Sequence, residues 1–194
     1  MDRRIAGFKG EFLWELEVQE NQTVALAEAF PVEQYGWRPE RGVRSVSEVF
    51  VHLATGNFLL LDLVGARRPA DLFGQVEGGV FDRLQAIIRK SIGLEGSITE
   101  KEDVVKLLKQ SLKAVREAFT KASDAELERL GHFFGEQTSV RRVYLRMLAH
   151  MNEHMGQAVA YARLNGVVPP WPDPRGARIA GGKPAPGRVA SAES

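Results

Sequence analysis

Apolar side chains recur at spacings of three and four residues along four long segments of the chain, and this period predicts amphipathic helices. The first helix is predicted over residues 9–29, and Pro31 ends it. The second begins at Ser45, because Ser45 and Glu48 match the capping-box pattern, in which each side chain satisfies a backbone N–H of the first turn. Its predicted inward face carries five residues: Val49, His52, Leu53, Leu59 and Leu60.

A long crossover is predicted to separate the second helix from the third. It covers residues 64–96 and contains an amphipathic stretch at 81–92 that favours a short helix. The third helix is predicted over residues 99–122, with Thr99 and Glu102 as a second capping-box pattern. A crossover of this length lets the third helix lie where a tight hairpin connection would not place it.

The fourth helix has the clearest ends. Thr138 or Ser139 caps its start, and Gly166 follows it as a typical helix stop. No segment shows a convincing strand pattern. The predicted fold is therefore all-α: a four-helix bundle with a long crossover between helices 2 and 3, covering residues 1–171. Residues 172–194 are rich in Pro, Gly and Ala and are predicted to form a flexible tail.

Composition narrows the class of protein further. The formal net charge of +1 gives no reason to expect a nucleic-acid or anionic-membrane partner. Cysteine is absent, which removes disulfides and thiolate metal ligands and fits a reducing compartment. Residues 1–10 have no apolar core after their arginines, so we do not expect a signal peptide there, and the longest apolar stretch, 58–66, is interrupted by Asp62. We therefore expect a soluble, cytoplasmic protein that does not span a membrane.

Three of the four histidines are predicted to lie inside helices and on their apolar faces. His150 and His154 are four residues apart, so their rings project from one helix face, one turn apart. Met147 and Tyr161 share that face, which places it toward the core. His52 is on the apolar stripe of the second helix. Burying imidazole rings is costly unless each ring finds a partner, and a metal ion is one such partner.

This pattern leaves two interpretations open. An interior histidine is commonly a hydrogen-bonded core residue, and a pair four residues apart also arises by chance. A third histidine on another helix makes a shared metal ion about as good an explanation. His132 is predicted to lie in a loop beside Gly131 and Gly135, and we do not expect it to be a ligand.

Two polar residues of the fourth helix are candidates for a catalytic role. Glu153 lies about 60° around the helix from His150, so it flanks the histidine pair. Gln157 lies about 20° around the helix from His150, on the same face as the pair, and about one turn beyond His154. The alternatives are a solvated surface carboxylate for Glu153 and core packing for Gln157.

Three stretches of the sequence are typical of one known family: RSVSEVFVH at 44–52, FFGEQ at 133–137 and HMNEHMGQ at 150–157. Through them the sequence resembles the DinB (damage-inducible, YfiT-like) superfamily of metal-binding helical bundles. The continuation over 161–171 strengthens it, and the match runs in order over 12–171. The tail lies outside the likeness.

The resemblance implies a four-helix bundle in which one histidine of the second helix and two of the fourth bind a divalent ion. All three positions are present, as His52, His150 and His154. The resemblance also implies that homodimers are common, and that some relatives are S-transferases or isomerases using low-molecular-weight thiols.

Three neutral imidazoles on a divalent ion leave a coordination position open, as in catalytic sites. The ion retains its full charge and favours deprotonation of bound water or a thiol. We therefore expect a thiol- or water-activating enzyme, resembling a thiol-dependent S-transferase, that acts on a small-molecule substrate. Glu153 or Gln157 would orient the nucleophile or a ligand. Zinc or nickel suits the nitrogen ligands best, and iron, manganese or copper is an alternative.

Two other functions are compatible with the sequence. Residues 150–154 also match the H-x-x-E-H pattern of inverzincin peptidases, which take a downstream glutamate as third ligand. The only glutamate after His154 is Glu193, close to the end of the tail, so this alternative is disfavoured. The other is a non-catalytic bundle that binds a metal or small ligand or serves in dimerisation.

Overall fold

The computed structural model describes residues 7–66, 68–76, 78–133 and 135–171. This part of the chain is mostly helical, as predicted for an all-α protein. Its elements are, in chain order, α1 (Gly7–Ala29), η2 (Val32–Gln34), α2 (Val46–Val64), α3 (Ala70–Phe73), α4 (Val80–Ser97), α5 (Lys101–Lys121), α6 (Asp124–Glu128), β1 (Leu130–Phe133), β2 (Glu136–Ser139) and α7 (Val140–Leu164). The predicted tail, 172–194, lies outside the described residues.

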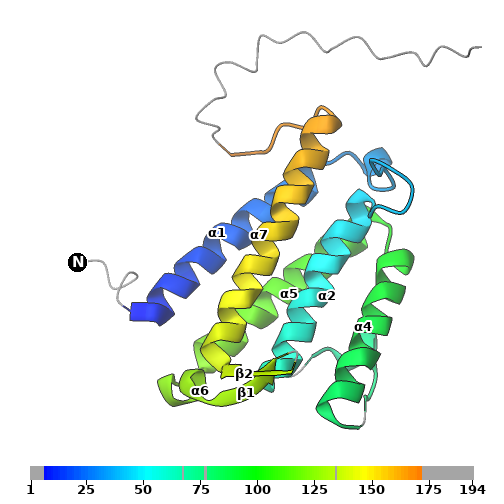
Figure 1. The fold of residues 1–194 in the computed structure, drawn as a ribbon. Helices are drawn as coiled ribbons and strands as arrows, with labels where there is room; N and C mark the ends of the chain where they lie inside the picture. Colours follow the sequence, from blue (N-terminus) through cyan, green and yellow to red (C-terminus); the bar gives the residue numbers. More distant parts are fainter. Residues whose placement is uncertain (1–6, 67, 77, 134, 172–194) are drawn as a thin grey trace, which may run out of the picture.

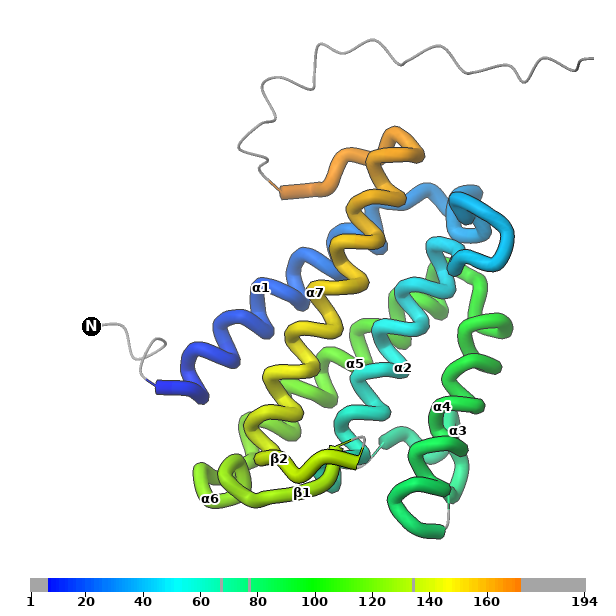
Figure 2. The backbone as a smooth tube through the Cα atoms, viewed as in Figure 1, coloured from blue at the N-terminus to red at the C-terminus, as the bar shows by residue number. Residues whose placement is uncertain are grey.

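The four longest core helices, α1, α2, α5 and α7, pack side by side (Figure 1). Each of them contacts two others: α1 and α2 both pack against α5 and against α7. The smoothed backbone shows α4 outside this group, where it packs against α2 (Figure 2). This arrangement makes α2 the central element of the fold, with neighbours on three sides.

The start of α2 is fixed by the capping box that the sequence predicted. Ser45 Oγ accepts a hydrogen bond from the Glu48 backbone N–H at 3.3 Å, and Glu48 Oε2 accepts from the Ser45 N–H at 2.8 Å. Ser139 caps α7 by accepting from the Arg142 N–H, also at 3.3 Å. After α7, Gly166 adopts a φ of +73°, a conformation that favours glycine and ends the helix.

The capping box predicted for α5 is wrong. The helix begins two residues later than expected, with Glu100 at the N-cap and no side-chain cap bond. Thr99 therefore lies outside the first turn, and its hydroxyl donates to the Glu100 carboxylate at 3.4 Å instead. Glu102 and Asp103 stand in the first turn, where negative charge is stabilised by the helix dipole.

The expectation that the chain contains no strand is also wrong. β1 and β2 form an antiparallel hairpin in which Leu130 pairs with Ser139 and Phe133 with Glu136. Each strand has four residues, and none of them is fully buried. Strands this short and this exposed need no alternation of apolar and polar residues, so the sequence pattern gave no sign of them. Gly135, in the turn, adopts a φ of +89°.

The crossover between α2 and α5 contains a longer helix than expected. The predicted segment, 81–92, becomes the 18-residue α4, preceded by the single-turn α3. Most of α4 is solvated. Its buried face is a narrow stripe of four residues: Leu84, Ile87, Ser91 and Glu95.

The core surrounds α2. This helix is long and apolar enough to cross a membrane by length and composition, but 72% of that window is buried inside the fold. It is therefore the core helix of a soluble domain. Around it, aromatic rings interlock: Phe12 and Phe119 stack with centroids 3.9 Å apart, and Tyr144 meets both rings edge-on.

We expect Ser45→Ala to lower the free energy of unfolding by about 1 kcal/mol, because the first turn of α2 loses the acceptor for an otherwise unpaired N–H. Urea denaturation measures this change. Ser123→Ala is the matched control. Ser123 forms the same capping box with Glu126, but on the five-residue, exposed helix α6, where we expect a smaller loss. Equal losses in both variants would contradict a special role for the cap of α2.

Candidate metal centre

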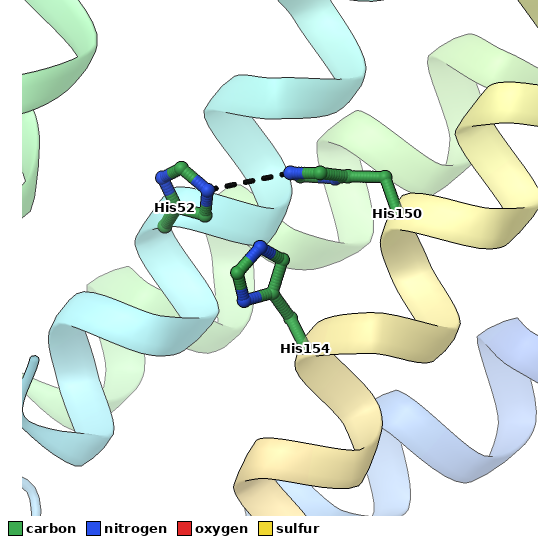
Figure 3. Close-up of side chains that lie close together, drawn as sticks. All are labelled: His52, His150 and His154. Atoms are coloured by element: carbon green, nitrogen blue, oxygen red, sulfur yellow. Dashed lines mark hydrogen bonds between the residues drawn. The ribbon is translucent and has the colours of Figure 1, made fainter.

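Two helices position the three candidate histidines. His52 lies in the second turn of α2, and His150 and His154 lie one turn apart on α7, which packs against α2. Figure 3 shows the three rings pointing toward one another across the space between these helices. The structure thus brings together all three histidines that the sequence singled out.

The distances between the rings suit a single ion. One nitrogen from each ring can be chosen so that the three atoms lie within 4.8 Å of one another. The Nε2 atoms of His52 and His150 are 3.3 Å apart. Two nitrogens on one tetrahedral zinc ion, each about 2.0–2.1 Å from it, lie about 3.3 Å apart. The pair therefore already has the spacing that ligation requires.

Hydrogen bonds on the outer nitrogens of His52 and His154 leave lone pairs on their inner nitrogens, and the dashed line in Figure 3 marks the contact between the inner nitrogens of His52 and His150. His52 Nδ1 lies 2.7 Å from Glu95 Oε1, so it donates to the carboxylate and its Nε2 has a free lone pair. His154 Nδ1 lies 3.1 Å from Gln157 Oε1, and Gln157 Nε2 donates to the Tyr161 hydroxyl at 2.8 Å. His154 Nε2 is therefore free as well. These contacts fix His52 and His154 in the tautomer that a metal ligand needs.

The His150 ring occupies space that only glycine provides. A Cβ atom on Gly56, one turn after His52 on α2, would lie 2.4 Å from His150 Cε1. The ring is pressed against the α2 backbone, and its Nδ1 is buried without a hydrogen-bond partner. A buried ring with an unpaired polar atom is costly, so ligation through its other nitrogen would offset part of that cost.

Burial favours the neutral form of His150 and His154. Desolvation, followed by the neighbouring His154 and His52, lowers the pKa of His150 to about 3. Desolvation also lowers the pKa of His154, although its hydrogen bond to Gln157 acts the other way. A metal must bind neutral imidazole, so protons compete little with an ion at these two rings near neutral pH.

Sequence reasoning missed Glu95 and Arg44. Arg44 Nε donates to Glu95 Oε2 at 2.7 Å, and the other carboxylate oxygen faces His52. Burial alone would raise the pKa of Glu95, but the hydrogen bonds and charges of His52 and Arg44 outweigh it and hold that pKa below its ordinary value. One signal pointed to Glu95: it continues the buried stripe of α4 at a spacing of four residues from Ser91.

Glu153 and His132 lie apart from this group. The Glu153 side chain is 53% exposed, and both of its oxygens accept hydrogen bonds from Arg146, at 2.8 and 2.9 Å. His132 is in β1, opposite Gln137, and does not belong to the histidine group. Of the two polar candidates on the fourth helix, only Gln157 has a described hydrogen bond to a histidine of the group.

A soluble helical domain with a three-histidine group that can hold one metal ion is the class that this fold and site define. A model of the DinB superfamily matches residues 15–158. The chain belongs to the DinB superfamily, as the sequence motifs predicted.

Two solved structures share the fold. A DinB-like protein from Bacillus cereus ATCC 10987 superposes with a TM-score of 0.63 at 18% identity, covering 84% of this chain and 95% of its own. A DinB-like protein (YjoA) from Bacillus subtilis gives a TM-score of 0.57 at 16% identity, covering 81% and 94%. At these identities the likeness concerns the fold alone. No curated protein matches the chain.

We expect Gly56→Ala to displace the His150 ring and to weaken metal binding by about tenfold or more, since the new methyl carbon would lie only 2.4 Å from Cε1 of the present ring. Competition with a chromophoric chelator measures the affinity. Gly156→Ala is the matched control, because Gly156 is a helical glycine of α7 with no atom within 4 Å of an added Cβ. That substitution should leave affinity unchanged and add up to about 1 kcal/mol of stability from helix propensity. Equal affinities in the two variants would contradict the steric argument.

The pKa of His150 predicts that the metal-free protein loses stability as the pH falls from about 6.5 toward 3. Above the ordinary histidine value of 6.5, the ring is neutral in both folded and unfolded chains. Below it, only the unfolded chain takes up the proton, so the free energy of unfolding falls by at most about 1.4 kcal/mol per pH unit, less for a ring partly open to solvent. His154 acts in the same direction.

Urea denaturation of chelator-treated protein over this pH range measures the slope. The variant His150→Gln lacks the titrating ring and should show a shallower dependence. A slope that is the same in the variant and the parent would show that other groups cause the acid sensitivity.

Proposed function

We propose that this DinB-superfamily protein is a four-helix-bundle metalloprotein that holds one divalent ion with His52, His150 and His154 and uses it to activate a nucleophile. The observation that carries the proposal is the convergence of three imidazole rings, two of which, His52 and His154, have hydrogen bonds on their outer nitrogens that leave lone pairs on the inner ones. Zinc or nickel is the preferred ion, since three neutral nitrogen ligands suit either, and iron, manganese or copper would also be accepted.

The proposed nucleophile is a low-molecular-weight thiol, with water as the alternative. A divalent ion bound by three neutral ligands supplies positive charge that favours the deprotonated form of a thiol or water molecule in its open position. The thiol preference rests on the family resemblance. The partial exposure of all three histidines supports access by a small molecule.

The residues around the rings have orienting roles in this proposal. Gln157 holds His154 in one tautomer and is itself fixed by the Tyr161 hydroxyl. Glu153 is engaged with Arg146, so the proposal assigns it no proton transfer unless that ion pair opens. The reaction therefore depends on the ligand group and on Gln157 more than on a separate base.

We further propose that the protein is a cytoplasmic homodimer. The absence of cysteine agrees with a reducing compartment, and the dimer follows from the family resemblance. Sedimentation velocity of the metal-loaded protein tests the dimer, and a purely monomeric species at high concentration would contradict it.

A non-catalytic metal- or ligand-binding bundle is the second candidate. The observation that favours it is the engagement of both polar candidates of α7: Glu153 with Arg146, and Gln157 with His154 and Tyr161. Neither is free to accept a proton from a substrate in this arrangement.

We expect protein purified without added metal or a polyhistidine tag to contain about one divalent ion per chain. His52→Ala and His154→Ala should each lower metal affinity by at least about tenfold, because each removes a ligand. Elemental analysis and chelator competition measure the content and the affinity. His132→Ala is the control, since this histidine lies outside the group. Loss of metal in the control, or full retention in both ligand variants, would contradict the proposed site.

Activity is tested on the same samples with cysteine or glutathione as thiol and chlorodinitrobenzene as electrophile. In this transfer the thiol loses its proton to solvent, sulfur bonds to the aryl carbon and chloride leaves. Turnover that disappears on chelation and in His52→Ala would support the enzyme. Metal-loaded protein that turns over neither this electrophile nor simple esters would favour the non-catalytic bundle.

A further inference from the structure

We propose that Glu95 is a positioning residue of the metal centre, and that through it metal binding stabilises the packing of the crossover helix α4 against α2. This inference rests on the proposed metal site. It adds a residue from an element outside the three-histidine group and gives the crossover a function.

The first step is the geometry of a three-residue chain of contacts. Arg44, just before α2, donates from Nε to Glu95 Oε2 at 2.7 Å, and Glu95 Oε1 lies 2.7 Å from His52 Nδ1. Both oxygens of the carboxylate are therefore used. A carboxylate on the outer nitrogen of a ligating histidine fixes the direction of the ring and makes its inner nitrogen a better donor to a metal.

The second step is the burial of the carboxylate. Glu95 is only 8% exposed, and it is the one charged residue in the described core of α4. A buried carboxylate without partners is costly, and here Arg44 and His52 compensate that cost. When His52 ligates a cation, the ring becomes a stronger hydrogen-bond donor, so its bond to Glu95 strengthens.

The third step is the attachment of α4. Its fully buried residues are Leu84, Ile87, Ser91 and Glu95, and among these Ser91 has a buried hydroxyl without a partner. Its main packing is against α2, to which an ion pair between Arg83 and Asp62 also joins it. Because Glu95 is one of four fully buried residues of α4, a stronger bond there strengthens its attachment. An ion that strengthens this bond therefore also stabilises the docked position of α4. By thermodynamic linkage, docking of α4 raises the affinity for the ion by the same factor.

The test measures metal affinity in Glu95→Gln by chelator competition with zinc. The amide keeps the shape of the side chain but loses its charge, so we expect affinity to fall roughly 10- to 100-fold. The matched control is Glu20→Gln. Glu20 also pairs with an arginine of a neighbouring helix, Arg116, and no described hydrogen bond or ion pair joins it to a histidine. We expect the zinc affinity of Glu20→Gln to stay within about twofold of the zinc affinity of the parent protein.

A second readout separates positioning from a merely structural role. Hydrogen exchange should show slower exchange of the α4 amides when zinc is added to the parent, and little zinc-dependent slowing in Glu95→Gln. A purely structural glutamate would speed exchange equally with and without zinc and leave affinity unchanged, which would overturn the inference. If the parent and Glu20→Gln bind no zinc at all, the proposed metal site fails. If they bind and Glu95→Gln binds equally well, only this inference fails.

Discussion

The structure around the histidines depends on one constraint: three imidazole rings share a small volume between α2 and α7, where burial favours the neutral form of His150 and His154. Two protonated rings whose Nε2 atoms lie 3.3 Å apart would repel strongly. Desolvation lowers the pKa of His150, while Glu95 and Gln157 accept hydrogen bonds from the outer nitrogens of His52 and His154. The inner nitrogens of these two rings therefore direct lone pairs toward His150, which is an arrangement that a cation stabilises.

The rest of the bundle holds this cluster in place from several directions. The capping box at Ser45 fixes where α2 begins, and therefore where His52 stands two turns later. Gly56 sets how closely α7 approaches α2 at the level of His150. Because α2 also packs against α5, a shift of α2 to relieve the crowded rings would disturb the apolar core. The site and the core therefore constrain each other.

The sequence predicted those parts of the site that depend on spacing within one helix. His150 and His154 could be paired because four residues make about one turn, and His52 because it continued an apolar stripe. Gly56 and Glu95 were missed, since their roles arise from contacts between helices distant in sequence. The same reason explains the fold: the long helices were predicted, while the β1–β2 hairpin, with no buried face to impose a pattern, was not.

Charge distinguishes this site from one built only to stabilise a fold. Structural zinc sites commonly use thiolates, which neutralise the ion and close its coordination. Here all three candidate ligands are neutral, and the nearby carboxylate of Glu95 is already balanced by Arg44. An ion bound to the histidines would keep most of its positive charge at a partly exposed position. Retained positive charge attracts an anionic ligand, and this balance of charges supports the proposed activation of a nucleophile over the alternative of a non-catalytic bundle.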